Sequence, residues 1–249
     1  MQVKLTLEYD GTNYAGWQLQ REQDTIQGRL ESALERIFSA PVRVRGAGRT
    51  DAGVHALGQV AAARIPRPFD AAELKRALNA LLPPDIAVLD SAIVDDDFDP
   101  RRSAICRVYE YRILNRPSRS AFEYRYAWLV GEVLDLEAMN TAASIFVGEH
   151  DFAGFRSVGS EERSTRRRVY ASQWTRLNNR FTYRVEAESF LRHMVRTMVS
   201  AMAEAGRGRA HPSSISELLL RGDRALAPAP APAAGLFLTE VHYPNRPGE

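Results

Sequence analysis

Cysteine, lysine and long apolar runs are scarce in this chain of 249 residues. The single cysteine, Cys106, excludes a disulfide within the chain and is typical of a reducing compartment. No apolar run approaches the roughly 20 residues that a helix needs to cross a bilayer. The first ten residues alternate like a strand and lack the apolar centre of a signal peptide. We therefore expect a cytoplasmic protein that makes no contact with a membrane.

Lysine is so rare that almost all of the positive charge is arginine. Of 33 basic residues only Lys4 and Lys75 are lysines. The planar guanidinium suits phosphates and base edges better than an ammonium group, although a GC-rich genome would produce the same bias. The net charge is only +2, so clustering is more informative. One short segment gathers Arg163, Arg166, Arg167 and Arg168. This cluster indicates a basic face for a polyanion, and a solvated loop is the alternative.

Hydrophobic periodicity predicts alternating strands and helices in the first half of the chain. The predicted elements are strands at 3–9, 42–45, 59–65 and 86–94, a helix at 25–39 behind a capping box at Asp24, and a helix opened by Asp70. Their order is β-α-β-β-α-β, which is the ferredoxin-like arrangement. A polar, proline-containing segment at 95–102 then marks the boundary between a domain at 1–103 and a domain at 104–249.

A similar order is expected in the second half. The predicted elements are strands at 107–115, 124–130, 168–177, 180–188 and 235–243, helices capped by Asp135 and Ser189, and a short helix after Pro212. A hairpin should turn at Asn178-Asn179. We therefore predict an α+β fold of two ferredoxin-like (RRM-like) βαββαβ halves with antiparallel sheets and a catalytic cleft between them.

The segment GAGRTDAGVHALGQ, residues 46–59, is the candidate active site. It connects two predicted strands and is longer than a tight hairpin turn requires. Its glycines at 46, 48, 53 and 58 permit positive φ and close approach by another molecule. The spacing fails the dinucleotide-binding fingerprint because Asp51 replaces the third glycine, and no Lys-Ser/Thr pair completes a P-loop. The five histidines show no ligand spacing, so we expect no metal site.

Asp51 is the reactive group that remains, and two interpretations of it stay open. An aspartate beside glycine often forms an Asx turn within its own loop. Alternatively, a buried carboxylate kept ionised by an arginine serves as nucleophile or base.

Several stretches together resemble the tRNA pseudouridine synthase A (TruA) family. They are GAGRTDAGVHALGQV, the upstream YDGTNYAGWQLQ at 9–20, RVYEYRILN at 107–115, FLRHMVRTMV at 190–199 and the final GLFLTEVHYP. They span nearly the whole chain in the same order as in the family. Two departures, Ser200 in place of glycine and Ala233-Ala234 in place of a proline-rich approach, do not touch the proposed chemistry.

The resemblance implies an isomerase that converts uridine to pseudouridine at positions 38, 39 and 40 of the tRNA anticodon stem-loop, without a cofactor and as a homodimer. It makes Asp51 the nucleophile, attacking either the sugar C1′ or the uracil ring. It makes Arg196 the partner of Asp51, Tyr109 the residue that stacks on the uracil, and Arg49 the residue that fills the space of the extruded base. The alternative for Arg196 is a surface arginine, and the alternative for Tyr109 is a strand aromatic in the core.

Other residues are expected to bind the substrate RNA. They are Arg163, Arg166, Arg167, Arg168, His55, Gln59 and Arg192. Two rival functions remain. A non-catalytic RNA-binding module would also suit RRM-like halves, but it has no need of a carboxylate in a loop that approaches phosphate. A small-molecule α+β enzyme would leave the arginine clustering unexplained.

Overall fold

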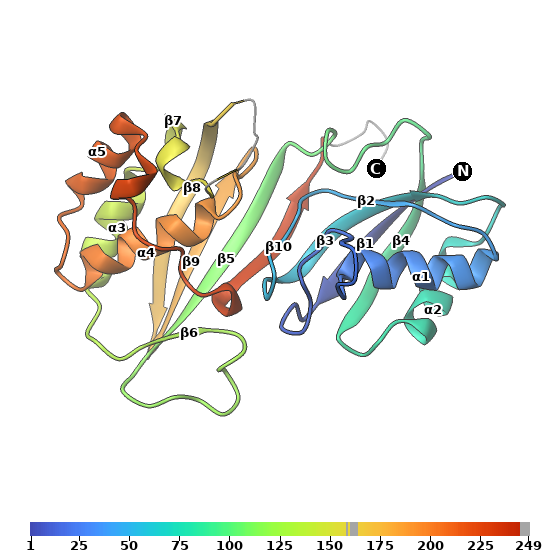
Figure 1. The fold of residues 1–249 in the computed structure, drawn as a ribbon, viewed down its shortest axis with the longest axis horizontal. Helices are drawn as coiled ribbons and strands as arrows, with labels where there is room; N and C mark the ends of the chain where they lie inside the picture. The colour runs from blue at the N-terminus through green and yellow to red at the C-terminus, as the bar shows by residue number, and fades with distance from the viewer. Residues whose placement is uncertain (158, 160–163, 245–249) are drawn as a thin grey trace. The chain divides into compact units, whose positions relative to one another are not determined.

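The computed structural model describes residues 1–157, 159 and 164–244, and its internal contacts divide the chain into two compact units (Figure 1). Unit 1 comprises Met1–Ile105 and Phe237–Glu249, and unit 2 comprises Cys106–Leu236. The fold is mixed α/β, with mostly antiparallel strand pairing and five α-helices in the described ranges. None of these helices is long and apolar enough to span a membrane. The C-terminal segment belongs to unit 1, whereas the sequence placed it in a second domain at 104–249.

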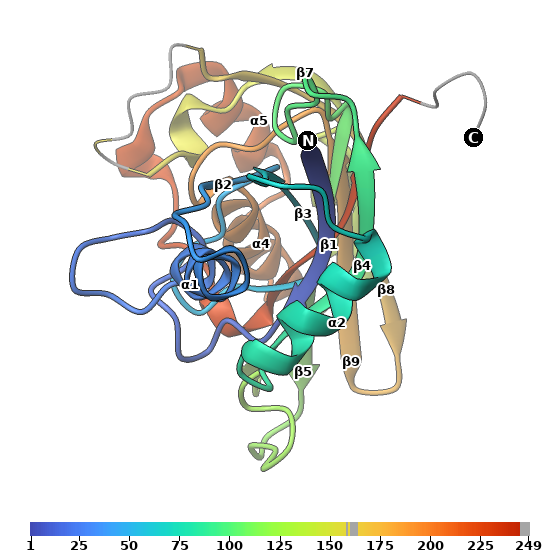
Figure 2. The same cartoon turned by 90° about the vertical axis from the view of Figure 1, so that its right-hand side faces the viewer.

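Unit 1 contains the predicted β-α-β-β-α-β order. Its elements are β1 (Gln2–Tyr9), α1 (Ile26–Phe38), β2 (Val44–Gly46), β3 (His55–Arg64), α2 (Ala71–Leu81), β4 (Ile86–Val94) and most of β10 (Leu236–His242). The strand order is β4-β1-β3-β10, and β2 pairs with β3. β10 is parallel to β3, whereas the other pairs in this unit are antiparallel. Figure 2 shows α2 running beside β4.

The helices of unit 1 begin at side chains that satisfy their first backbone N–H groups. Asp70 accepts from Glu73 N–H, as the sequence predicts. The predicted capping box at Asp24 is wrong, because Thr25 is the N-cap of α1 and accepts from Gly28 N–H. Asp24 instead binds Arg29 through both of its carboxylate oxygens. This pairing with Arg29 lowers the pKa of Asp24.

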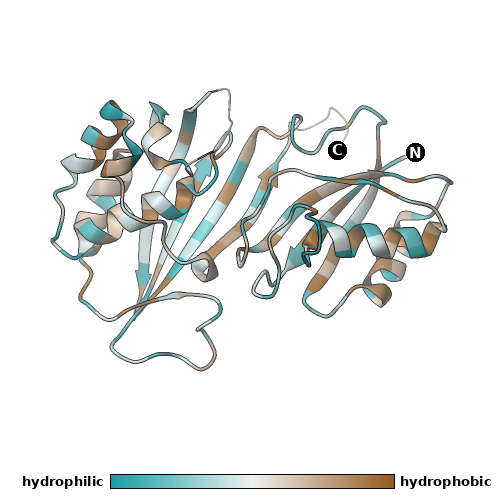
Figure 3. Ribbon diagram, in the orientation of Figure 1, coloured by the Kyte–Doolittle hydropathy of each residue, from teal (hydrophilic) through white to brown (hydrophobic). Residues whose placement is uncertain are grey.

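Unit 2 is built on the strand order β5-β9-β8-β7. Its elements are β5 (Cys106–Asn115), β6 (Trp128–Val130), α3 (Leu136–Ser144), β7 (Gly148–Asp151), β8 (Arg166–Leu177), β9 (Arg180–Ala187), α4 (Met194–Gly206) and α5 (Ser213–Arg221), with short 3-10 turns at 153–155, 224–226 and 233–235. β6 is parallel to β5. Figure 3 shows the polar and apolar alternation as bands along β5.

Three features of unit 2 differ from the predictions. The strand predicted at 124–130 begins only at Trp128. Ser189 does not cap α4, because the helix begins at Met194 after His193, whose φ is +65°. The left-handed residue turns the chain sharply, and the preceding Phe190 packs edge-on against Tyr109. The sequence also missed β7, a short strand without alternation that pairs with the start of β8. The hairpin turn at Asn178-Asn179 and the Asp135 cap of α3 are confirmed.

In both units, an asparagine side chain on a helix forms hydrogen bonds with the backbone of a strand. In unit 1, the amide of Asn79 on α2 donates to Val88 C=O at 2.9 Å and accepts from Val88 N–H at 2.7 Å. In unit 2, the amide of Asn140 on α3 bonds both backbone groups of Trp174 on β8. Unpaired groups at a strand edge invite pairing with another chain. Each asparagine thus satisfies backbone groups that its sheet leaves open and fixes a helix to that strand.

We predict that Asn79→Ala and Asn140→Ala each lower the free energy of unfolding by about 1–3 kcal/mol. Each substitution leaves one backbone N–H and one backbone C=O of a strand without a hydrogen-bond partner. Urea unfolding followed by circular dichroism measures this loss. Asn13→Ala is the matched control, since Asn13 is exposed and should change the stability by less than about 0.5 kcal/mol. Wild-type stability in both variants would contradict a structural role for the two amides.

Candidate functional site

The glycine loop occupies residues 47–54, between β2 and β3 of unit 1. It is shorter than predicted because β3 begins at His55 rather than at Gln59. Ala47 N–H donates to Val60 C=O at 2.8 Å, which fixes the start of the loop to the strand that follows it. A turn closes its end, where Val54 N–H donates to Asp51 C=O at 3.1 Å. Asp51 therefore stands at the first position of a turn whose third residue, Gly53, has a φ of +76°.

A second loop, residues 10–17, holds the glycine loop through its backbone. Trp17 N–H donates to Thr50 C=O at 3.0 Å, and Gly53 N–H donates to Tyr14 C=O at 3.3 Å. A Cβ atom at Gly16 would lie 2.5 Å from the carbonyl oxygen of Thr50, and the φ of Gly16 is +98°. Only glycine suits this approach. The motif YDGTNYAGW at 9–17 is thus the structural partner of the motif that contains Asp51.

Two glycines of the loop region make room for the protein itself. A Cβ atom at Gly46 would lie 2.6 Å from the Trp17 ring, and one at Gly58 would overlap the backbone of Thr239 on β10. The sequence suggested close approach by another molecule at these positions. The space at Gly46 and Gly58 is instead filled by an indole ring and by a neighbouring strand.

A buried polar chain lies beneath the loop. The Gln59 side-chain amide donates to Gly48 C=O at 2.9 Å and more weakly to the Tyr9 hydroxyl oxygen at 3.4 Å. Because Tyr9 accepts from Gln59, its own proton is available to the Thr50 hydroxyl at 2.9 Å. Burial raises the pKa of Tyr9 to about 12, so its hydroxyl remains protonated at neutral pH. The chain therefore fixes Gly48 and Thr50, which flank Arg49 and precede Asp51.

His55 and Gln59 are buried in unit 1 and support two different loops. His55 is 1% exposed, stacks on Phe237 at 4.6 Å and accepts from Gly11 N–H through Nδ1. Gln59 is fully buried and holds Gly48. The sequence placed both among the residues that bind substrate. Because both are buried, we give them positioning roles: Gln59 holds Gly48 of the glycine loop, and His55 holds Gly11 of the loop at 10–17.

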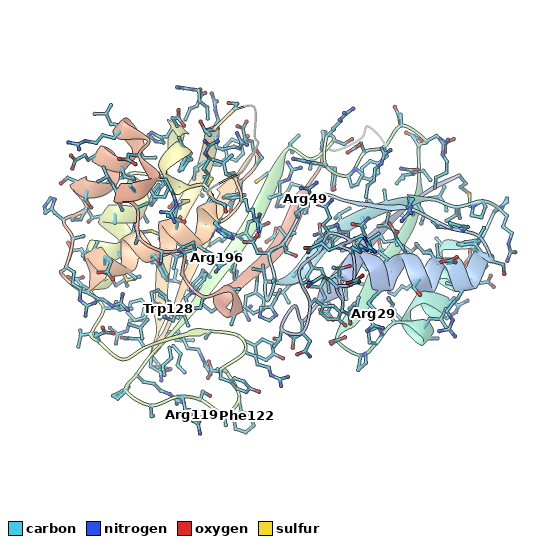
Figure 4. All side chains as sticks on the ribbon, in the orientation of Figure 1. Arg29, Arg49, Arg119, Phe122, Trp128 and Arg196 are labelled. Atoms are coloured by element: carbon cyan, nitrogen blue, oxygen red, sulfur yellow. The ribbon has the colours of Figure 1, made fainter. Side chains whose placement is uncertain are left out.

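The loop presents its charged side chains differently. Arg49 is exposed and Asp51 is half-buried. Thr50, between them, is buried and points to Tyr9. Figure 4 labels Arg49 on the ribbon of unit 1. A half-buried carboxylate on a backbone that is fixed on both sides is a suitable nucleophile, because little ordering is needed before it reacts.

Of the predicted site residues in unit 2, three lie on β5 or at the start of α4. Tyr109 is a buried member of β5, as the alternative of a core aromatic also expects. Arg196 lies in the first turn of α4 and is half-buried. Its Nε donates to Ala231 C=O at 2.6 Å, while Ala231 N–H donates to Arg196 C=O at 3.0 Å. Arg192 is exposed just before α4.

Three members of the arginine cluster lie on β8, beside Glu149 of β7, and Arg163 lies outside the described residues. Arg166 and Arg168 approach Glu149 at 3.2 and 3.1 Å, and together they lower the pKa of Glu149, with Arg168 the larger cause. Arg167 donates to the backbone carbonyls of Ser164 and Arg166. Exposed ion pairs contribute little stability, so phosphate could compete with Glu149 for the guanidinium groups of Arg166 and Arg168.

No group of three or more potential ligand side chains comes together as a metal site in the described ranges.

Comparison with known proteins identifies relatives along the whole chain. A family model described as tRNA pseudouridine synthase matches residues 6–101 and 142–244. A protein of Myxococcus xanthus called tRNA pseudouridine synthase A is 44% identical over 247 residues, covering 98% of this chain and 93% of its own. A protein of Geotalea uraniireducens with the same name is 42% identical over 242 residues, covering 97% of this chain and 99% of its own. A solved chain of a Cbf5-Nop10-Gar1 complex aligns with 11% identity and a TM-score of 0.31, too low to support an argument.

We predict that Gln59→Leu lowers the free energy of unfolding by about 1–3 kcal/mol, because the half-buried Gly48 C=O loses its donor. Hydrogen exchange should also show faster exchange in the glycine loop. Gln20→Leu is the control, since Gln20 likewise donates to a backbone carbonyl, Ala15 C=O, but at an exposed position. Equal stability and exchange in the two variants would contradict the positioning role.

The raised pKa of Tyr9 predicts alkaline destabilisation. Its folded-state pKa of about 12 exceeds the usual 10, so the unfolded chain releases the proton first and stability falls as pH rises from 10 to 12. Tyr9 alone should account for about 2–3 kcal/mol of this fall. In Tyr9→Phe the fall measured by urea unfolding at successive pH values should be correspondingly smaller. An unchanged pH profile would show that Tyr9 does not titrate as its burial implies.

Proposed function

The chain belongs to the tRNA pseudouridine synthase family, and from this premise we propose that it isomerises uridines 38, 39 and 40 of the tRNA anticodon stem-loop with Asp51 as the nucleophile. As a member of this family it is an isomerase that acts on tRNA. The observation that carries the proposal about Asp51 is its place in the fixed loop at 47–54, within the motif GRTDAGVHA.

The reaction requires one bond to be exchanged for another. The N1–C1′ bond of the nucleotide breaks, the uracil turns, and a C5–C1′ bond forms while the proton on C5 is lost to water and N1 gains a proton. A carboxylate can attack C1′ as the base departs, as in retaining glycosidases, or it can add to the uracil ring. In either case Asp51 must be ionised and held in place, and the backbone hydrogen bonds of Trp17 and Gly53 support the second requirement.

The remaining roles form part of the same proposal. Arg49, which is exposed on the loop, would occupy the position of the extruded base. Tyr109 would stack on the uracil, and Arg196 would keep the nucleophile ionised. Arg192 and the arginines at 163 and 166–168 would contact phosphate. We also propose a homodimer and an absence of cofactors, as the family resemblance implies. Two ferredoxin-like halves and a place in the cytoplasm are proposed from the predicted element order and from the single cysteine.

We predict that Asp51→Asn binds tRNA as tightly as the wild type but lowers turnover by roughly a thousandfold or more, because a neutral amide is not a nucleophile. The assay follows tritium released from unmodified tRNA that carries 5-tritiated uridine. Asp90→Asn is the control, because this substitution removes the same charge from unit 1 at an exposed position on β4.

Three outcomes separate the candidate functions. Full release by Asp51→Asn would refute the nucleophile assignment. Binding of tRNA without release by the wild type would favour a non-catalytic RNA-binding module. Release from uridines outside positions 38–40, mapped after chemical marking of pseudouridine, would retain the isomerase and refute the proposed specificity.

A further inference from the structure

Between β5 and β6 of unit 2 lies a segment of unusual composition, residues 116–127, which we call the arm. It carries three arginines and three aromatic residues: Arg116, Arg119, Arg125, Phe122, Tyr124 and Tyr126. Phe122 is 88% exposed and Tyr124 is 59% exposed. Figure 4 shows Arg119 and Phe122 close together at the outer bend of the arm. Single exposed apolar side chains are common, but a group of exposed aromatics with arginines is typical of a binding surface.

The base of the arm is fixed to the strands that flank it. Asn115 donates through its side-chain amide to Val130 C=O at 2.9 Å and to Glu132 C=O at 2.6 Å. The guanidinium of Arg116 donates to Ser118 C=O and Arg119 C=O, at 2.8 and 2.9 Å. Arg116 therefore shapes the arm from within.

The outer part of the arm has its own supports. The buried hydroxyl of Ser120 accepts from the N–H groups of Phe122 and Glu123. Glu123 binds Arg180 of β9 through both oxygens, at 2.8 and 2.9 Å, and this pairing lowers the pKa of Glu123. The Phe122 ring is consequently held outward on an ordered backbone. Preorganisation of this kind reduces the entropy lost on binding.

The charge of the arm favours a polyanion as its partner. Its only carboxylate, Glu123, is already paired with Arg180, which lies outside the arm. Arg119 is exposed, and the guanidinium of Arg125 lies 5.3 Å from the centre of the Tyr124 ring. Arginine and aromatic side chains presented together contact phosphates and stack on unpaired bases.

We propose that the arm binds an unpaired segment of the tRNA substrate, with Phe122 stacking on a base and Arg119 contacting a phosphate. The proposal rests on the proposed function, because it takes tRNA as the ligand. It adds a contact surface that none of the residues assigned to the site provides. A second copy of this chain is a less suitable partner, since two arms facing each other would bring like charges together.

Phe122→Ala tests the stacking, with binding measured by filter retention of labelled, unmodified full-length tRNA. The dissociation constant should rise about tenfold, the loss typical of one base–aromatic stack, and Phe122→Trp should restore it. Leu220→Ala is the matched control, because Leu220 is also 88% exposed in unit 2 but lies on α5. Binding of a fully paired RNA duplex should be the same for wild type and Phe122→Ala, because it offers no unpaired base.

Arg119→Gln tests the phosphate contact. The slope of the logarithm of affinity against the logarithm of salt concentration should fall in magnitude by about one, as expected when one phosphate contact is lost. The slope of Phe122→Ala should equal that of the wild type. An unchanged slope in Arg119→Gln would refute its role.

The outcomes separate this proposal from the function on which it rests. If the wild type releases tritium from tRNA but Phe122→Ala binds tRNA as tightly as Leu220→Ala, the arm proposal fails and the isomerase proposal stands. If Phe122→Ala instead alters the sedimentation of the RNA-free protein, and tRNA binding falls only in step with that change, the arm joins copies of the chain and the RNA proposal is overturned. If the wild type binds no tRNA, both fail.

Discussion

The backbone bonds between the loop at 10–17 and the glycine loop at 47–54 are the constraint on which the candidate site depends. Asp51 lies between Thr50, whose carbonyl accepts from Trp17, and Gly53, whose N–H donates to Tyr14. Side-chain substitutions cannot remove these bonds directly, so the position of Asp51 is set by chain geometry. The absence of a side chain at Gly16 permits the approach, and the buried chain from Gln59 to Thr50 supports it from below.

Sequence periodicity predicted the elements whose signals are local. Asp70 and Asp135 cap their helices because an aspartate before an amphipathic run satisfies the first N–H groups wherever the helix packs. The predicted helix cap at Ser189 is wrong because the residues after it are held by tertiary contacts. Phe190 packs on Tyr109, and His193 adopts a left-handed conformation that no local pattern predicts. β7 was missed for a related reason, since its four residues gain strand structure only by pairing with β8.

The candidate site was predicted as a set of residues but not as a division of roles. The motif identified Asp51, Arg49, His55 and Gln59 together because they are close in sequence. The structure separates them by burial: His55 and Gln59 are buried members of β3, whereas Arg49 is exposed on the loop before it. The sequence predicted a strand that begins at Gln59, so His55 was expected in the loop although β3 begins there. Proximity in sequence does not show which side chains of the motif are buried, because burial depends on how β3 packs against its neighbouring strands.

The low net charge of +2 does not weaken the case for a polyanionic substrate, because the arginines are not equivalent. Arg29, Arg166, Arg168 and Arg180 are each within hydrogen-bonding distance of a carboxylate. Arg49 and Arg119 are exposed and form no ion pair with any residue that the structure describes. An ion pair cancels most of the long-range field of its arginine, whereas an exposed arginine without an ion pair attracts phosphate at little cost in desolvation. A chain that is nearly neutral in total can therefore still present exposed arginines to phosphate, as Arg49 and Arg119 are presented here.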